Sequence, residues 1–257
     1  MRATKIIENI VIGMKMLRRP SVRYCANNGL LPEVLTETLT EEVRDFFFLP
    51  RSPHKTQLNQ DIFALLINRF ARGYFLEIGA NDGFTISNTV YLEEHFRWDG
   101  LLVEANPEYE PRLKERKAKS VIAAIAEREG EHEFRSAGLY GGLSLTLNET
   151  HTSKWKDAKQ IRVRGVKLER VLLENEAPEL INFVSIDVEG AELEVVSQMC
   201  NLATHKIVCG CIEHNNRAAE YKKIENLLRS AGYQIVWEHQ TGHDIFFVQP
   251  GLVSASV

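Results

Sequence analysis

The chain has 257 residues, of which 44% are hydrophobic and 26% are charged, and this composition is typical of a folded globular protein. Its net charge of −4 gives no general attraction to nucleic acid or anionic lipid, and its four scattered cysteines are too few for a disulfide scaffold. No apolar run approaches the roughly 20 residues of a spanning helix. The length suits one large domain or a domain with an extension, and the cysteine usage favours a reduced, cytoplasmic setting.

Residues 1–54 are predicted to form an irregular, partly helical N-terminal extension, because prolines interrupt the stretch at positions 20, 32, 50 and 53. Apolar side chains over 6–17 fall on one helical face, and basic residues follow. A peripheral membrane contact would produce this pattern, and so would docking on the chain's own domain or on a second copy in a homo-oligomer. No small-residue cleavage site follows, so a signal peptide is not predicted.

After this extension, helical and strand patterns alternate. Helices are predicted over 57–70, 87–96, 107–117, from 191, and over 217–231, with strands over 74–78, 100–104, 120–125, 183–187 and 206–212. The polar segment over 127–159 separates the third and fourth of these strands, and 131–135 and 160–166 alternate like further strands. Two closing strands, over 233–238 and 244–249, predict one antiparallel strand at the sheet edge. The order predicts an α/β fold with a doubly wound, mostly parallel sheet.

The most informative segment is the turn after the first strand. It contains Gly79, Asn81, Asp82 and Gly83, and a polar, glycine-bounded turn at the carboxyl end of a buried strand is where open α/β sheets bind ligands. Glu104 ends the next strand, where an acidic side chain accepts hydrogen bonds from a ribose diol. Together they predict a pocket for an adenosine-containing ligand.

The residue types of this turn favour a cationic ligand. A dinucleotide site requires a close glycine pair that brings a helix N-terminus to the pyrophosphate, and this pair is absent. Asp82 would also place a negative charge there, whereas S-adenosylmethionine carries a sulfonium and an amino group. The turn therefore favours a methyl donor, and an NAD(P)-dependent oxidoreductase is the alternative hypothesis.

Several segments match a known family; they are 57–61, 75–84, 87–89, 92–93, 102–107 and 185–192. Through them the chain resembles the FkbM family of class I S-adenosylmethionine-dependent methyltransferases over about 55–249. The resemblance implies a methyltransferase domain over 55–257 and a seven-stranded, Rossmann-like sheet with one reversed strand. It also implies O-methylation, often of sugars or glycosylated metabolites.

The resemblance further implies roles for single residues. Those expected around the methionine half of the donor are Glu77, Gly79, Asn81 and Gly83. Glu104 is expected to hold the ribose with Asn106 close to it, and Ala124 and Ile125 are expected beside the adenine.

Two strand ends supply candidate catalytic groups. Asp187 ends the strand over 183–187 with Glu189 in the following turn, where acidic residues also cap the next helix. Glu213 and His214 end the strand over 206–212. The predicted catalytic residues are Asp187, Glu213 and His214, because a carboxylate or imidazole can take the proton of an alcohol acceptor. Alternatively, these side chains and Glu189 hold a divalent cation.

Other features are given structural interpretations or left open. Cys209 and Cys211 are interpreted as buried packing, because zinc sites need four well-placed ligands. The charge run over 114–119 is interpreted as a solvated helix face. Residues 136–155 are a candidate acceptor side or a surface hairpin; they include Gly138, Tyr140, Gly141, Gly142, Ser144, His151 and Trp155. A non-catalytic adaptor that retained the fold is a second rival function, and no nucleic-acid partner is expected.

Overall fold

The computed structural model describes residue 56 and residues 60–69, 71–137, 140–144, 158–214, 217–236 and 243–253. The predicted N-terminal extension and its amphipathic helix lie outside the described residues, as do His151 and Trp155. Within the described ranges, no helix combines the length and the apolar character needed to cross a membrane.

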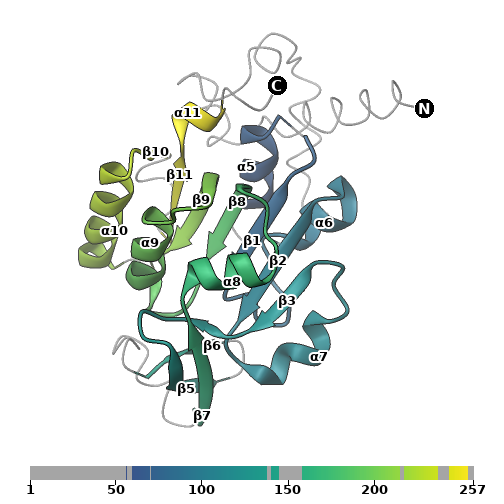
Figure 1. Ribbon diagram of the computed structural model, residues 1–257, viewed down its shortest axis with the longest axis vertical. Helices are drawn as coiled ribbons and strands as arrows, with labels where there is room; N and C mark the ends of the chain where they lie inside the picture. Colours follow the sequence, from purple (N-terminus) through teal and green to yellow (C-terminus); the bar gives the residue numbers. More distant parts are fainter. Residues whose placement is uncertain are drawn as a thin grey trace.

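A seven-stranded sheet forms the centre of the molecule (Figure 1), in the order β10-β11-β9-β8-β1-β2-β3. Its strands are β1 (Tyr74–Ile78), β2 (Asp99–Glu104), β3 (Lys119–Ile122), β8 (Leu180–Ile186), β9 (Lys206–Glu213), β10 (Gln234–Val236) and β11 (Asp244–Val248). The pairings among β1, β2, β3, β8 and β9 are all parallel, whereas β11 is antiparallel to both its neighbours. The predicted doubly wound sheet with one reversed strand is confirmed, although that strand lies one position in from the edge.

Helices cover both faces of this sheet (Figure 1). Side chains of α5 (Gln60–Ile67), α6 (Val90–Phe96) and α7 (Glu110–Leu113) pack in one apolar cluster with Phe75 and Phe183. Those of α8 (Leu168–Glu174), α9 (Glu192–Cys200) and α10 (Ala218–Ser230) pack in a second cluster with Leu76 and Val184. Successive residues of β1 and β8 therefore face opposite layers, as the two-residue period of a strand requires.

The observed helices differ in part from the predicted ones. The helix predicted over 107–117 is a short 3₁₀ turn (Pro107–Tyr109) followed by the single turn of α7, because Pro111 lies within it. The helix α8 falls in a stretch where no helix was predicted. A short final helix, α11 (Pro250–Val253), follows β11.

A second sheet of four strands lies at one end of the central sheet (Figure 1), in the order β4-β7-β5-β6. Its strands are β4 (Ala124–Ile125), β5 (Gly130–Ala137), β6 (Tyr140–Leu143) and β7 (Lys159–Val166). The prediction of a single strand over 120–125 is therefore wrong. The chain leaves the central sheet after Ile122, where the Ala123 amide donates to the Glu104 carbonyl of β2 at 2.8 Å. Ala124 and Ile125 then pair with β7 in the second sheet.

Candidate active site

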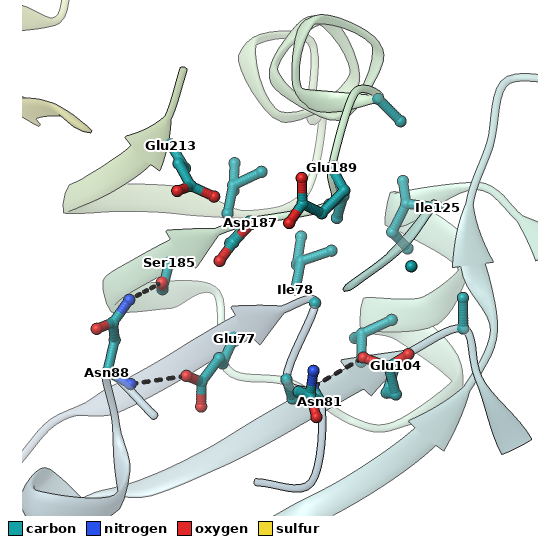
Figure 2. A pocket seen from close by; sticks show the side chains of 18 of the residues that line it. Glu77, Ile78, Asn81, Asn88, Glu104, Ile125, Ser185, Asp187, Glu189 and Glu213 are labelled. Atoms are coloured by element: carbon teal, nitrogen blue, oxygen red, sulfur yellow. Dashed lines mark hydrogen bonds between the residues drawn. The ribbon is translucent and has the colours of Figure 1, made fainter. Parts of the chain in front are cut away.

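A cavity of about 350 Å³ opens at the carboxyl ends of the central strands (Figure 2). Its floor comes from the ends of β1, β2, β8 and β9, and Phe134, Gly141 and Leu143 of the second sheet line it as well. This is the edge of an open α/β sheet where ligands bind, and β1 is the point at which the strand order reverses.

Gly79 permits the close approach of two strand ends at the floor of the cavity. It has a φ of +85°, and a Cβ atom at this position would lie 1.6 Å from the Asp187 carbonyl oxygen. The Asp187 amide donates to the Ile78 carbonyl at 3.0 Å, which holds the end of β8 against the end of β1. Only glycine fits this position, so the turn and Asp187 are fixed as one unit.

Glu104 lines the cavity at the end of β2 and organises the turn after β1. One carboxylate oxygen accepts a hydrogen bond from the Asn81 amide at 2.8 Å (Figure 2), and the other accepts one from the Asn106 amide at 2.7 Å. Burial raises the pKa of Glu104 above its ordinary value, although these amide hydrogen bonds oppose the rise. A carboxylate oxygen can accept more than one hydrogen bond, so both oxygens of Glu104 can also bind a ligand.

The far wall beyond Glu104 is more apolar. Ala124 and Ile125 line it together with Phe134 and Leu143. The Asn106 side chain, 2% exposed, donates to Ser136 at 3.0 Å and thereby joins the end of β2 to the second sheet. This wall can accommodate a flat, mostly apolar ring.

Glu77 borders the cavity, but the following loop saturates its carboxylate. It accepts hydrogen bonds from the Asn88 amide at 2.8 Å and from the hydroxyls of Ser87 and Thr89. Burial raises its pKa above the ordinary value, against the opposing charge of Arg116. Glu77 therefore braces the loop over 85–89 that forms one side of the cavity.

Arg116, which follows α7, anchors the same loop. The charge run over 114–119, to which it belongs, was expected to be a solvated helix face. The Arg116 side chain is 1% exposed, and it donates to Glu93 at 3.0 Å and to Thr89 at 3.1 Å. It also donates to the Gly83 carbonyl and to the Ser87 hydroxyl. The interpretation is wrong for Arg116, because a single buried cation can occur within an otherwise exposed charge run.

Asp82 and Gly83 lie in the turn but not among the residues that line the cavity. Asp82 accepts hydrogen bonds from the amides of Phe84 at 2.8 Å and Thr85 at 2.6 Å, and from the Thr85 hydroxyl. Burial alone would raise the pKa of Asp82, but these bonds and the charge of Arg112 lower it below its ordinary value. A Cβ atom on Gly83 would lie 2.9 Å from the Leu113 side chain.

Three carboxylates converge on the cavity at the ends of β8 and β9. Asp187, Glu189 and Glu213 each place an oxygen within 4.8 Å of the other two, and Figure 2 shows them pointing into one space. Asp187 is exposed at the cavity. Its pKa is nevertheless raised well above the ordinary value by the surrounding protein atoms, by a hydrogen bond with Glu213 and by the charges of the nearby carboxylates. The carboxylates of this cluster therefore repel one another, and Asp187 holds a proton more tightly than an isolated carboxyl group does.

His214, the remaining predicted catalytic residue, does not line the cavity. Its ring packs edge-on against Tyr221, with centroids 5.2 Å apart, and its backbone amide donates to the His243 carbonyl at 2.7 Å. Burial lowers the pKa of His214 below its ordinary value, so its ring is neutral. Alternation along β9 accounts for this, because Glu213 and His214 point to opposite faces.

Several cavity residues carried no assignment from the sequence. Asn88 donates to Ser185 at 2.9 Å across the floor, Gln60 donates to Asp244 at 2.9 Å, and His243 lines the same part of the wall. Cys211, which was interpreted as buried packing, also lines the cavity. A signal for Asp244 was present, because an acidic residue opens the apolar strand β11. Only the β9–β11 register, which places Asp244 opposite Glu213, reveals that it reaches the site.

Comparison with known proteins identifies the family. The model of the methyltransferase FkbM domain matches residues 77–235, which is more than half of the chain. The solved structure of methyltransferase FkbM from Methylobacillus flagellatus KT has 13% identity and a TM-score of 0.44, over 68% of this chain and 43% of that one. Precorrin-6y C5,15-methyltransferase from Geobacter metallireducens GS-15 has 10% identity and a TM-score of 0.37, over 73% of this chain and 85% of that one.

TrmK from M. capricolum, solved with S-adenosylhomocysteine, has 11% identity and a TM-score of 0.33, over 72% of this chain and 66% of that one. The chain thus spans less than half the length of the M. flagellatus protein. No curated protein matches the sequence. From the domain match, the chain belongs to the FkbM methyltransferase family.

Proposed function

We propose that this chain is an S-adenosylmethionine-dependent O-methyltransferase that methylates a hydroxyl group of a sugar, a glycan or a glycosylated metabolite. One observation carries the proposal: a single cavity has Glu104 and the Gly79 turn at one side and the Asp187 and Glu213 carboxylates at the other. The first pair suits the donor, and the second suits an acceptor that must lose a proton.

In this proposal the donor lies across the ends of β1 and β2. Glu104 accepts hydrogen bonds from the ribose hydroxyls, and the apolar wall at Ala124 and Ile125 receives the adenine. The turn over 79–81 lies against the methionine part, and Gly79 keeps this turn packed on the Asp187 backbone. Glu77 and Asp82 support this arrangement by holding the loop, because their carboxylates bind loop donors.

The acceptor hydroxyl then attacks the methyl group in line with the departing sulfur, so positioning provides much of the rate. The oxygen loses its proton to the Asp187–Glu213 pair, which acts as the general base. His214 is left out of this mechanism, because its ring packs against Tyr221 outside the cavity lining.

The cluster also fits a divalent cation, because its all-oxygen donor set is the one that Mg²⁺ and Ca²⁺ prefer. Such an ion would be held by Asp187, Glu189 and Glu213 and would lower the pKa of an acceptor hydroxyl. Dialysis against a chelator separates the two schemes. Full turnover afterwards supports the general base, and loss restored by Mg²⁺ or Ca²⁺ supports the cation.

Isothermal titration calorimetry tests the donor half of the proposal. The wild-type chain should bind S-adenosylmethionine and not NAD(P), and Glu104→Gln should weaken donor binding by roughly 10- to 100-fold, the cost of charge-assisted hydrogen bonds. Glu94→Gln, on the exposed surface of α6, is the matched control and should bind normally. Binding of NAD(P) alone would favour an oxidoreductase, and donor binding without methylation of any glycan acceptor would favour the adaptor.

A further inference from the structure

Gln60 and Asp244 form a buried polar pair at one end of the cavity. The Gln60 amide nitrogen donates to the Asp244 carboxylate at 2.9 Å, and the two residues are only 4% and 9% exposed. They come from α5 and from the start of β11, so the pair joins two elements that are distant in the sequence. Both side chains line the cavity.

The strand order places this pair at the opposite end from the proposed ribose site. Glu104 ends β2, and β1, β8 and β9 lie between β2 and β11 in the sheet. Because neighbouring strands lie about 4.8 Å apart, β2 and β11 are separated by roughly 19 Å. Asp187 and Glu213, on the intervening strands, lie between the two ends. A donor that extends from Glu104 toward Asp187 therefore leaves the Asp244 end for the other reactant.

The register fixes how Asp244 relates to the proposed base. Its Cα is the direct cross-strand partner of the Glu213 Cα, and β11 runs antiparallel to β9, so the start of β11 lies at the cavity edge. Like charges directly opposite each other on two strands are unfavourable, and a buried carboxylate loses its hydration. Gln60 partly offsets this cost by donating to one Asp244 oxygen and thereby fixes the orientation of the carboxylate.

The lining of the cavity also limits the charge of an acceptor. It offers the carboxylates of Asp187, Glu189 and Glu213, the amide of Asn88 and, next to Asp244 in the chain, the ring of His243. Among the described residues, no lysine or arginine lines the cavity. A phosphate, sulfate or carboxylate group on the acceptor would meet this negative field without a permanently cationic side chain to offset it. Hydroxyl groups, in contrast, donate to carboxylates and accept from amides.

From the sheet order, the register and the lining, we infer that Asp244, oriented by Gln60, binds a hydroxyl of an uncharged, polyhydroxylated acceptor next to the one that is methylated. The inference rests on the proposed methyltransferase function and assigns the acceptor class and a specificity-determining residue. Gln60 acts as a positioning residue, because it works through the Asp244 carboxylate.

The test uses S-adenosylmethionine with a radiolabelled methyl group and an acceptor panel. The panel contains the methyl glycosides of glucose, galactose and mannose, with the 6-phosphate and the uronic acid of each. We expect label in the neutral glycosides and at least tenfold less in the charged forms. Equal transfer to phosphates or uronates would overturn the inference while leaving the methyltransferase function standing. No transfer to any member, despite donor binding, would refute the sugar-methylating function and the inference with it.

Variants then assign the effect to the pair. Asp244→Asn should raise the KM for the neutral glycoside roughly tenfold or more with the donor Kd changed less than about twofold, because only the acceptor loses a charge-assisted bond. Gln60→Met should act in the same direction, while Glu133→Gln on the exposed face of β5 should leave both constants unchanged. An unchanged acceptor KM in Asp244→Asn would remove Asp244 from the acceptor site, and equal losses for donor and acceptor would mean that it only supports the fold.

Discussion

Replacement of Asp244 by asparagine should make the protein more stable at neutral pH. Burial raises the pKa of Asp244 from 3.8 to about 6; Gln60 and His243 oppose the rise, and Glu213 adds to it. A difference of roughly 2 pKa units corresponds to about 3 kcal/mol between the protonated and ionised forms in the folded state. Asparagine mimics the protonated form and retains an oxygen for the Gln60 amide. We therefore expect a gain on the order of 1–3 kcal/mol at pH 8.

The sign of the pH dependence follows from the direction of the shift. The folded-state pKa of Asp244 lies above the unfolded-state value, so its protonation stabilises the fold fully below about pH 4. This contribution is lost as the pH rises through about 6. At pH 5 the wild-type carboxyl is mostly protonated in the folded state and already recovers about 1.4 kcal/mol. The advantage of Asp244→Asn should therefore shrink by roughly that amount between pH 8 and pH 5.

Urea denaturation followed by circular dichroism at pH 8 and pH 5 measures both quantities, and thermal melting should show a rise on the order of 5 °C at pH 8. Glu133→Gln, an exposed carboxylate on β5, controls for the loss of one negative charge and should change little at either pH. A destabilised Asp244→Asn at pH 8, or an advantage independent of pH, would refute the argument that the Asp244 carboxylate is held at an energetic cost.

Three further substitutions test the support of the cavity. Gly79→Ala should abolish donor binding and lower the melting temperature sharply. The control Gly130→Ala has a φ of +119° but no atom within 4 Å of the added Cβ, so it should cost only about 1–2 kcal/mol of stability. Similar losses for the two variants would show that backbone strain alone matters at Gly79. Arg116→Met should lower the free energy of unfolding in urea by about 3–5 kcal/mol, because it leaves Glu93 buried without its cation. The control Lys114→Met breaks an exposed ion pair and should lower it by less than about 1 kcal/mol. Ile86 is 42% exposed and has a φ of +58°, a backbone conformation that asparagine adopts more readily than a β-branched residue. Ile86→Asn should therefore stabilise the protein by about 1 kcal/mol in a thermal melt. A loss of stability would mean that the Ile86 side chain packs more than its exposure indicates.

Much of the fold follows from local patterns in the sequence. Apolar runs bounded by glycine and polar residues located β1, β2, β8 and β9, and the short link before Asp244 indicated the reversed strand. The departure of the chain from the central sheet after Ile122 could not be predicted in this way. The apolar character continues through Ala123 to Ile125, and only the pairing of Ala124 and Ile125 with β7 reveals the change of sheet.

The placement of candidate site residues was predictable where position along a strand decides it. Glu104 and Asp187 end parallel strands, so they meet at one edge of the sheet. The partner of a carboxylate, in contrast, depends on tertiary contacts. Asp82 was expected to meet a cationic ligand through its charge, but its oxygens accept three hydrogen bonds from Phe84 and Thr85. A sequence pattern cannot distinguish these two uses of an acidic residue in a glycine-rich turn.

The arrangement along the sheet separates the proposed reaction from the choice of acceptor. The residues proposed for donor binding and proton removal lie on or just after β1, β2, β4, β8 and β9, within the 77–235 segment that matches the family. Gln60 and Asp244 lie on α5 and β11, on either side of that segment. Substitutions in these flanking elements should therefore alter the proposed acceptor end without moving Glu104 or the Gly79 turn. It follows that the family match places the chain among FkbM methyltransferases, whereas our proposal places the choice of acceptor in the contacts that α5 and β11 make with the cavity.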